Sequence, residues 1–78
     1  MDRYLQPINA AKRVPSASAK RLAQFRTRRE AEDAALSIGW SALDATRIDV
    51  MGFYLWVITD PHGNAVTTDG LIAWRSER

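Results

Sequence analysis

The chain has 78 residues, a formal net charge of +2 and no cysteine. A chain this short folds as one small domain that buries roughly 60 to 65 percent of the surface of its unfolded chain. Without thiols it has neither disulfides nor a thiolate zinc site. Because 12 of the hydrophobic residues are alanines, we expect a thin core, which self-association into a homodimer can supplement.

Charge is distributed unevenly along the chain. Up to Arg29 there are eight basic residues and one acid, a local charge of +7, whereas from Glu30 onward three basic residues stand against eight acids, a local charge of −5. A basic segment on a mildly acidic body is typical of proteins that contact nucleic acid or another anionic surface.

The sequence predicts no membrane partner. The N-terminal stretch MDRYLQPINA lacks the apolar region of a secretory signal. The longest run of large apolar residues is six, far below the roughly 20 that a membrane helix needs. We therefore expect a cytoplasmic protein.

Residues 1–19 are expected to form a basic N-terminal arm or linker that is partly mobile, ahead of a single small α+β domain over residues 20–78. Within the arm, NAAKRVPSASA (residues 9–19) holds small and polar residues, one proline and no hydrophobic period. It therefore predicts no packed element.

The stretch KRLAQFRT, from Lys20, predicts a short strand that leads into a helix. Thr27 and Glu30, three residues apart, match a capping box, in which each side chain accepts the other residue's amide. Gly39 can take the left-handed conformation that ends a helix. We expect a helix over 28–38, with a narrow apolar stripe at helical spacing made by Ala31, Ala34, Ala35 and Ile38.

The next segment predicts a β-hairpin. ATRIDV (45–50) alternates, FYLWVI (53–58) is apolar throughout, and the two residues between them, Met51 and Gly52, suit a tight turn. In this register Val50 lies opposite Phe53. One face then carries Thr46, Ile48, Val50, Phe53, Leu55 and Val57, and the other carries Arg47, Asp49, Tyr54, Trp56 and Ile58.

The last part of the sequence contains two predicted turns. Asp60-Pro61-His62-Gly63 predicts a tight turn before a third strand at 64–68. Asp69-Gly70 predicts another turn, and 71–74 either a short fourth strand or one helical turn. The predicted fold is an α+β two-layer sandwich, β-α-β-β-β, in which one helix packs on a three- to four-stranded antiparallel sheet. We expect the helix on the face with Phe53, Leu55 and Val57, leaving Tyr54, Trp56 and Ile58 open.

Groups suited to catalysis are sparse, so we expect no enzyme, no metal and no cofactor. The only imidazole, His62, lies in a turn, and acids at the helix start (Glu30, Glu32 and Asp33) favour the helix dipole. The four glycines separate elements instead of clustering around a phosphate.

Two binding surfaces are predicted instead. The first consists of basic side chains that neutralise phosphates, or that simply keep a small domain soluble. Its members are Lys12, Arg13, Lys20, Arg21, Arg26, Arg28, Arg29 and Arg47. The second is an interface of Tyr54, Trp56 and Ile58, whose aromatic rings can stack bases or form a dimer core.

We therefore predict a small non-enzymatic binding module that contacts nucleic acid through its basic N-terminal third. The alternative is a dimeric protein-interaction or inhibitor module, like accessory proteins of phages and mobile elements, whose partner has an acidic surface. The stretch FRTRREAE (25–32) is similar to the strand, threonine cap and helix start of many small β-α units, including arm-type DNA-binding domains of phage integrases. In those domains the helix follows the three strands, and we claim no family from these eight residues.

Overall fold

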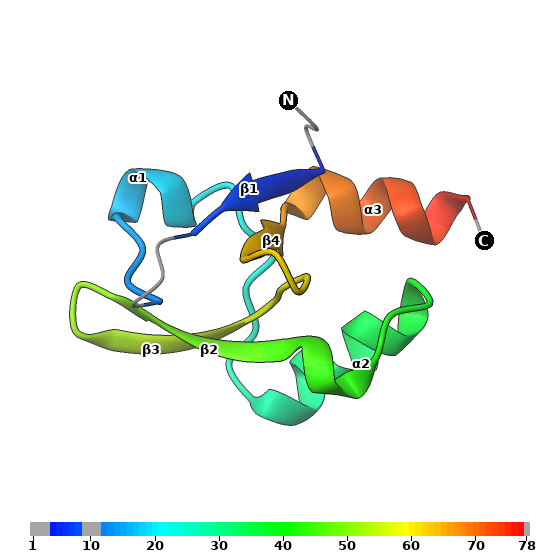
Figure 1. The fold of residues 1–78 in the computed structure, drawn as a ribbon, viewed down its shortest axis with the longest axis horizontal. Coiled ribbons are helices and arrows are strands. Elements are labelled where there is room, and N and C mark those ends of the chain that lie inside the picture. Colours follow the sequence, from blue (N-terminus) through cyan, green and yellow to red (C-terminus); the bar gives the residue numbers. More distant parts are fainter. Residues whose placement is uncertain (1–3, 9–11, 78) are drawn as a thin grey trace.

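The computed structural model describes residues 4–8 and 12–77 (Figure 1). In chain order its elements are β1 (Leu5–Pro7), α1 (Ser16–Ala19), α2 (Arg28–Ser37), the 3₁₀ helix η1 (Ala42–Asp44), β2 (Ala45–Val50), β3 (Phe53–Ile58), β4 (Asn64–Val66) and α3 (Thr68–Ser76). The α+β class is confirmed. No helix in the described ranges is both long and apolar enough to span a lipid bilayer.

The described strands form two antiparallel pairs instead of one sheet of three or four strands. β2 pairs with β3, with Val50 opposite Phe53 as predicted, and β1 pairs with β4. Within residues 4–8 and 12–77, a bridge between Thr59 and Ala65 connects the two pairs. The predicted third strand at 64–68 is cut short because Thr67 already caps the following helix.

The segment after β4 is helical, which corrects the turn expected at Asp69-Gly70 and the undecided structure of 71–74. The Thr67 hydroxyl oxygen accepts the Gly70 amide at 2.9 Å, a typical N-cap. Asp69 lies in the first turn of α3, where its charge favours the helix dipole. Turn-forming residues here serve the start of a helix.

Helix α2 follows the prediction closely and ends one residue earlier than expected. The Thr27 hydroxyl oxygen accepts the Glu30 amide at 3.2 Å, which is one half of the predicted capping box. Gly39 has a φ of +82°, as the end of the helix requires. The whole predicted stripe is buried: Ala31, Ala34, Ala35 and Ile38.

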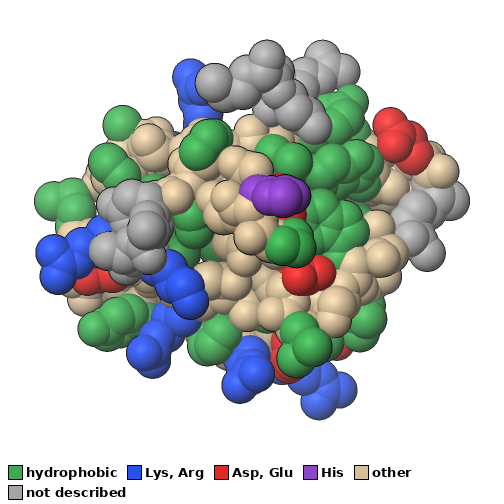
Figure 2. All heavy atoms as spheres, in the orientation of Figure 1, with side chains coloured by type: hydrophobic (Ala, Val, Ile, Leu, Met, Phe, Trp, Pro, Cys, Tyr) green, Lys and Arg blue, Asp and Glu red, His purple; other side chains and the backbone are tan. Residues whose placement is uncertain are grey.

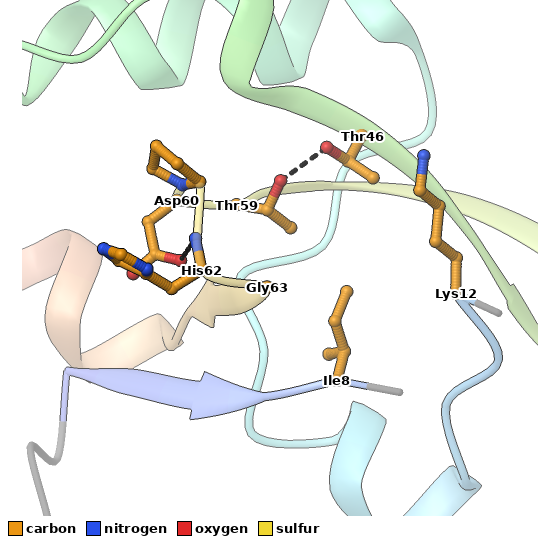
Figure 3. Close-up of a pocket in the computed structure, with 8 residues that line it drawn as sticks. Ile8, Lys12, Thr46, Thr59, Asp60, His62 and Gly63 are labelled. Atoms are coloured by element: carbon orange, nitrogen blue, oxygen red, sulfur yellow. Dashed lines mark hydrogen bonds between the residues drawn. The ribbon is translucent and has the colours of Figure 1, made fainter. Parts of the chain in front are cut away.

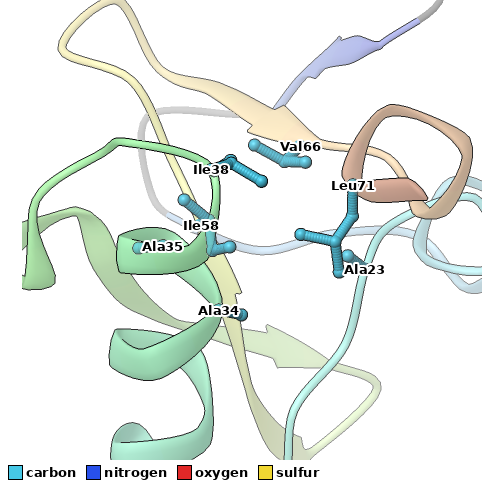
Figure 4. Close-up of a cluster of buried hydrophobic side chains, with 7 residues drawn as sticks. All are labelled: Ala23, Ala34, Ala35, Ile38, Ile58, Val66 and Leu71. Atoms are coloured by element: carbon cyan, nitrogen blue, oxygen red, sulfur yellow. The ribbon is translucent and has the colours of Figure 1, made fainter. Parts of the chain in front are cut away.

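The face of the hairpin that α2 covers is the opposite of the one expected. Ala34 and Ala35 share a core cluster with Ile58, to which β4 and α3 also contribute (Figure 4). The other face, with Ile48 and Val57, is covered by the segment 14–22. Figure 1 shows the hairpin as a middle layer, with α2 on one side and α1, β1 and α3 on the other. The apolar run of β3 is thus covered on both faces at its inner end.

The expectation that residues 9–19 form no packed element is wrong for 12–19. Val14 and Ala19 are buried. The Val14 amide donates to the Asp49 carbonyl and the Asp49 amide to the Lys12 carbonyl, each at 2.9 Å, so this segment runs beside β2. Residues 9–11 lie outside the described residues, and the mobility of the arm stays a prediction.

The strand predicted from Lys20 is reduced to two isolated bridges, Leu22 with Thr67 and Phe25 with Trp56. The segment crosses from one strand pair to the other. The Ala23 amide donates to the Val66 carbonyl at 3.1 Å, and the Phe25 amide donates to the Trp56 carbonyl at 2.8 Å. Because it bonds to two different strands in turn, it pairs along the length of neither.

Candidate nucleic-acid interface

The hairpin face that packs against α2 remains open toward the turn. Along this face Arg47 lies opposite Trp56, and Asp49 lies opposite Tyr54. Ile58 has 0% of its surface exposed, whereas Tyr54 is 64% exposed and Trp56 is half-buried. Ile58 is therefore not available to a partner, which corrects the predicted interface. The open surface is centred on Tyr54.

A third chain segment extends this face beyond β2. Arg13 forms a parallel bridge with Asp49. Residues bridged across neighbouring strands project to the same face, and the next residue, Val14, is buried under the other face. Arg13 therefore lies on the same side of the hairpin as Arg47 and Tyr54.

Two guanidinium groups in the described part of the chain lie over aromatic rings here. The Arg47 Cζ atom is 4.7 Å from the centroid of the Tyr54 ring. The Arg28 Cζ atom, from the first turn of α2, is 5.8 Å from the Trp56 ring. A guanidinium stacked on a ring keeps donors at its edge for a further partner. We name this surface, made by Arg13, Arg28, Arg47, Tyr54 and Trp56, the arginine–aromatic face.

Acidic groups near this face have structural roles. The Asp49 Oδ1 atom accepts the Gly52 amide at 2.8 Å and so holds the hairpin turn. Arg28 is 3.8 Å from Glu32, one helical turn away, in a surface pair in which Arg28 is exposed and Glu32 is half-buried. Surface ion pairs of this kind are weak, so a phosphate can compete for Arg28.

The other predicted basic residues do not share one surface. Lys20 and Arg21 are exposed and follow α1, on the side of the hairpin away from α2. Arg26 is exposed before α2, and Arg29 pairs with Asp33 at 3.7 Å. In Figure 2 the Lys and Arg side chains gather mainly over the half of the view that holds the β2–β3 hairpin, with hydrophobic side chains between them.

A pocket of about 430 Å³ lies elsewhere, between Ile8, Lys12, Thr46, Thr59 and the turn 60–63 (Figure 3). Three of its polar side chains are hydrogen bonded within the protein. The Thr46 and Thr59 hydroxyl oxygens are 2.6 Å apart, and the Asp60 Oδ1 atom accepts the backbone amides of His62 and Asn64 at 2.9 Å.

The Asp60 carboxylate stabilises the turn that it begins. Burial raises the pKa of its carboxyl, but the hydrogen bonds from Asn64 and the His62 amide outweigh burial and hold the pKa below its ordinary value. A lowered pKa makes this carboxylate a weaker base, and the backbone amides occupy its Oδ1 atom, so Asp60 is poorly suited to proton transfer. Within the described ranges no three His, Asp or Glu side chains are grouped to hold a metal ion.

Sequence reasoning missed the exposed tip of the hairpin. Phe53 was expected beneath the helix, yet it is 74% exposed, next to an exposed Met51. The signal available was Met51 itself, at a turn position where asparagine or glycine is usual. Comparison of the chain with protein-family models, with curated proteins and with solved structures found no match.

Proposed function

We propose that this protein is a non-enzymatic module that binds nucleic acid on its arginine–aromatic face, with unpaired bases stacked on the aromatic rings. The observation that carries the proposal is the Arg47 guanidinium 4.7 Å over the Tyr54 ring, on a sheet surface that α2 leaves open. Rings on an open sheet surface stack bases, and arginines beside them contact phosphates.

The face offers both parts of such recognition. Tyr54 presents an exposed ring, and stacking a base on a ring of this kind contributes about 1–3 kcal/mol. Arg13, Arg28 and Arg47 come from three chain segments around the rings, so a strand that crosses the hairpin meets cations on both sides. Two of the three, Arg13 and Arg28, belong to the basic segment of the sequence that ends at Arg29.

A protein partner with an acidic surface is the weaker candidate. Burial of Ile58 removes the aliphatic part of the predicted interface. What remains is cationic, and an acidic protein surface would use its arginines alone, whereas nucleic acid uses both the arginines and the exposed Tyr54 ring. We expect the binding to take place in the cytoplasm.

The proposal is tested with charge-reversal variants on and off the face. Their affinity for a labelled single-stranded oligonucleotide is measured by fluorescence anisotropy. Three phosphate contacts predict about a 20-fold loss of wild-type affinity between about 50 and 200 mM salt. Arg47→Glu and Arg13→Glu should each weaken binding by tenfold or more.

Arg75→Glu is the matched control. Arg75 lies on α3, where its Nε atom is 2.9 Å from the Ser37 hydroxyl oxygen, and the substitution changes the net charge by the same amount. We expect it to change affinity less than twofold. Equal losses for Arg75→Glu and Arg47→Glu, or no wild-type binding at low salt, would refute the proposal.

A further inference from the structure

The turn between β2 and β3 carries large apolar side chains into solvent. Met51 is 78% exposed and Phe53 is 74% exposed. Met51 has a φ of +53° and Gly52 a φ of +89°, the left-handed pair that a type I′ turn requires. Asparagine, aspartate and glycine are usual at the first position, because a longer side chain there is strained. A strained, exposed methionine therefore points to a use outside the fold.

This hairpin tip, Met51 to Phe53, is held in place and lies next to the arginine–aromatic face. The Ser16 hydroxyl, at the start of α1, is 2.8 Å from the Met51 sulfur. Arg13 lines the same surface hollow as Met51 and Gly52. Tyr54, with Arg47 over its ring, follows Phe53 directly. The tip thus adjoins the cationic surface at the end of the hairpin, while Phe53 and the Ser16-bonded Met51 sulfur lie on the side that faces α1.

We propose that Met51 and Phe53 form an apolar wedge at the end of the hairpin, which enters between neighbouring bases where the strand held on the arginine–aromatic face passes over the hairpin tip. This inference rests on the proposed function and adds a base-separating contact to it. Successive side chains of a strand point to opposite faces, so Phe53 and Tyr54 flank the hairpin on both sides, with Met51 at the apex. Apolar side chains placed beside arginines separate stacked bases in this way.

An anionic lipid surface has the same negative charge, but the structure favours nucleic acid. The tip offers only two large apolar side chains, a small area for membrane anchoring compared with the face of an amphipathic helix. The neighbouring surface is a pair of rings under guanidinium groups, and Asp49 lies among them. That surface matches bases and phosphates better than acyl chains.

The test uses Met51→Asn, Phe53→Ser and the double variant. Asparagine suits the left-handed position, so Met51→Asn should raise Tm by a few degrees while it weakens binding. Opposite changes in stability and affinity separate a functional loss from a folding defect. The matched control is Leu43→Ser, since Leu43 is 86% exposed in η1, at the other end of β2.

Affinity and base stacking are both read out, with a single-stranded oligonucleotide that carries the fluorescent base 2-aminopurine. The double variant should bind at least about fivefold more weakly at every salt concentration. The slope of its log affinity against log salt concentration should equal that of the wild type, because this slope reports the number of phosphate contacts. Wild-type binding should raise 2-aminopurine fluorescence as the base leaves the stack, the double variant should not, and Leu43→Ser should match the wild type.

Each contrary result identifies what has failed. If the wild type binds and the double variant binds equally well with the same fluorescence rise, the wedge is overturned while the face proposal stands. If the wild type does not bind the oligonucleotide, both are overturned. If the double variant keeps its oligonucleotide binding but no longer sediments with phosphatidylserine vesicles that the wild type binds, the tip is a membrane contact and the wedge is overturned.

Discussion

Replacing Gly70 with alanine should destabilise the protein, although alanine is the better helix former. Gly70 lies in the first turn of α3, against the N-terminal segment. A Cβ atom added there would lie 2.5 Å from the carbonyl oxygen and 2.9 Å from the Cα atom of Tyr4. Helix propensity alone favours alanine by about 1 kcal/mol, so the two effects have opposite signs.

The expected loss of unfolding free energy depends on which atoms must move to make room for the added Cβ atom. Backbone atoms so close force β1 away from α3, and overpacking of this kind costs about 1–3 kcal/mol. The same Tyr4 oxygen accepts the Thr67 amide at 3.0 Å, and weakening that hydrogen bond adds about 1 kcal/mol. After the helix gain is subtracted, we expect a net loss of about 2 kcal/mol, or a Tm lower by roughly 8–16 °C.

Thermal and urea unfolding, followed by far-UV circular dichroism, measure this loss. Gly52→Ala is the control, because Gly52 has a φ of +89° but no atom within 4 Å of an added Cβ, so that only backbone strain of about 1–2 kcal/mol acts there. A Gly70→Ala variant as stable as the wild type would refute the close packing of the N-terminal segment on α3.

Two further predictions concern stability. Thr27→Ala removes the α2 cap and should cost about 1 kcal/mol in urea unfolding, whereas Thr27→Ser, which keeps the hydroxyl, should cost less than half as much; equal losses would show that the hydroxyl is not the cap. The pKa of Asp60 is lowered from 3.8 in the folded state, so its contribution to stability is fully present above 3.8 and is lost as the pH falls through the lower folded value. The difference in unfolding free energy between the wild type and Asp60→Asn should therefore shrink as the solution is acidified, and a constant difference would contradict the assignment.

Local signals explain which parts of the fold could be predicted. The Thr27 cap, the alanine stripe of α2, the turn at Met51-Gly52 and the turn at Asp60 each depend on residues within a few positions of one another, and each is present. The residues on either side of the hairpin turn fixed its register for the same reason.

Long-range contacts explain the errors. Both faces of β3 are apolar, so the sequence did not decide which one α2 covers, and the choice depends on Val14 and Leu22 packing on the other face. Asp69-Gly70 has the composition of a turn, but the close packing of Gly70 on Tyr4 lies at the start of a helix. These long-range contacts leave no periodic pattern in the sequence. The cap at Thr67 is a local signal, which the prediction of a strand over 64–68 overlooked.

In the candidate site too, local patterns were predictable from the sequence and long-range contacts were not. Arg47, Tyr54 and Trp56 were expected on one face because strand alternation requires it, and the structure has them there. Charge alone did not distinguish Arg13 from Arg21. The bridge between Arg13 and Asp49 brings one of them to the face, while Arg21 lies beside α1 and β1.

The most direct test of the central claim is an NMR titration of the isotope-labelled protein with a single-stranded oligonucleotide, using the tryptophan indole N–H signals as reporters. Trp56 belongs to the arginine–aromatic face, whereas Trp40 and Trp74 pack together with ring centroids 5.5 Å apart, beside the core cluster that contains Ile38 and Leu71. We predict that the Trp56 indole signal and the amide signals of Arg47 and Tyr54 shift, while the Trp40 and Trp74 signals stay in place. Shifts centred on Trp40 and Trp74, or no shifts at all, would contradict it.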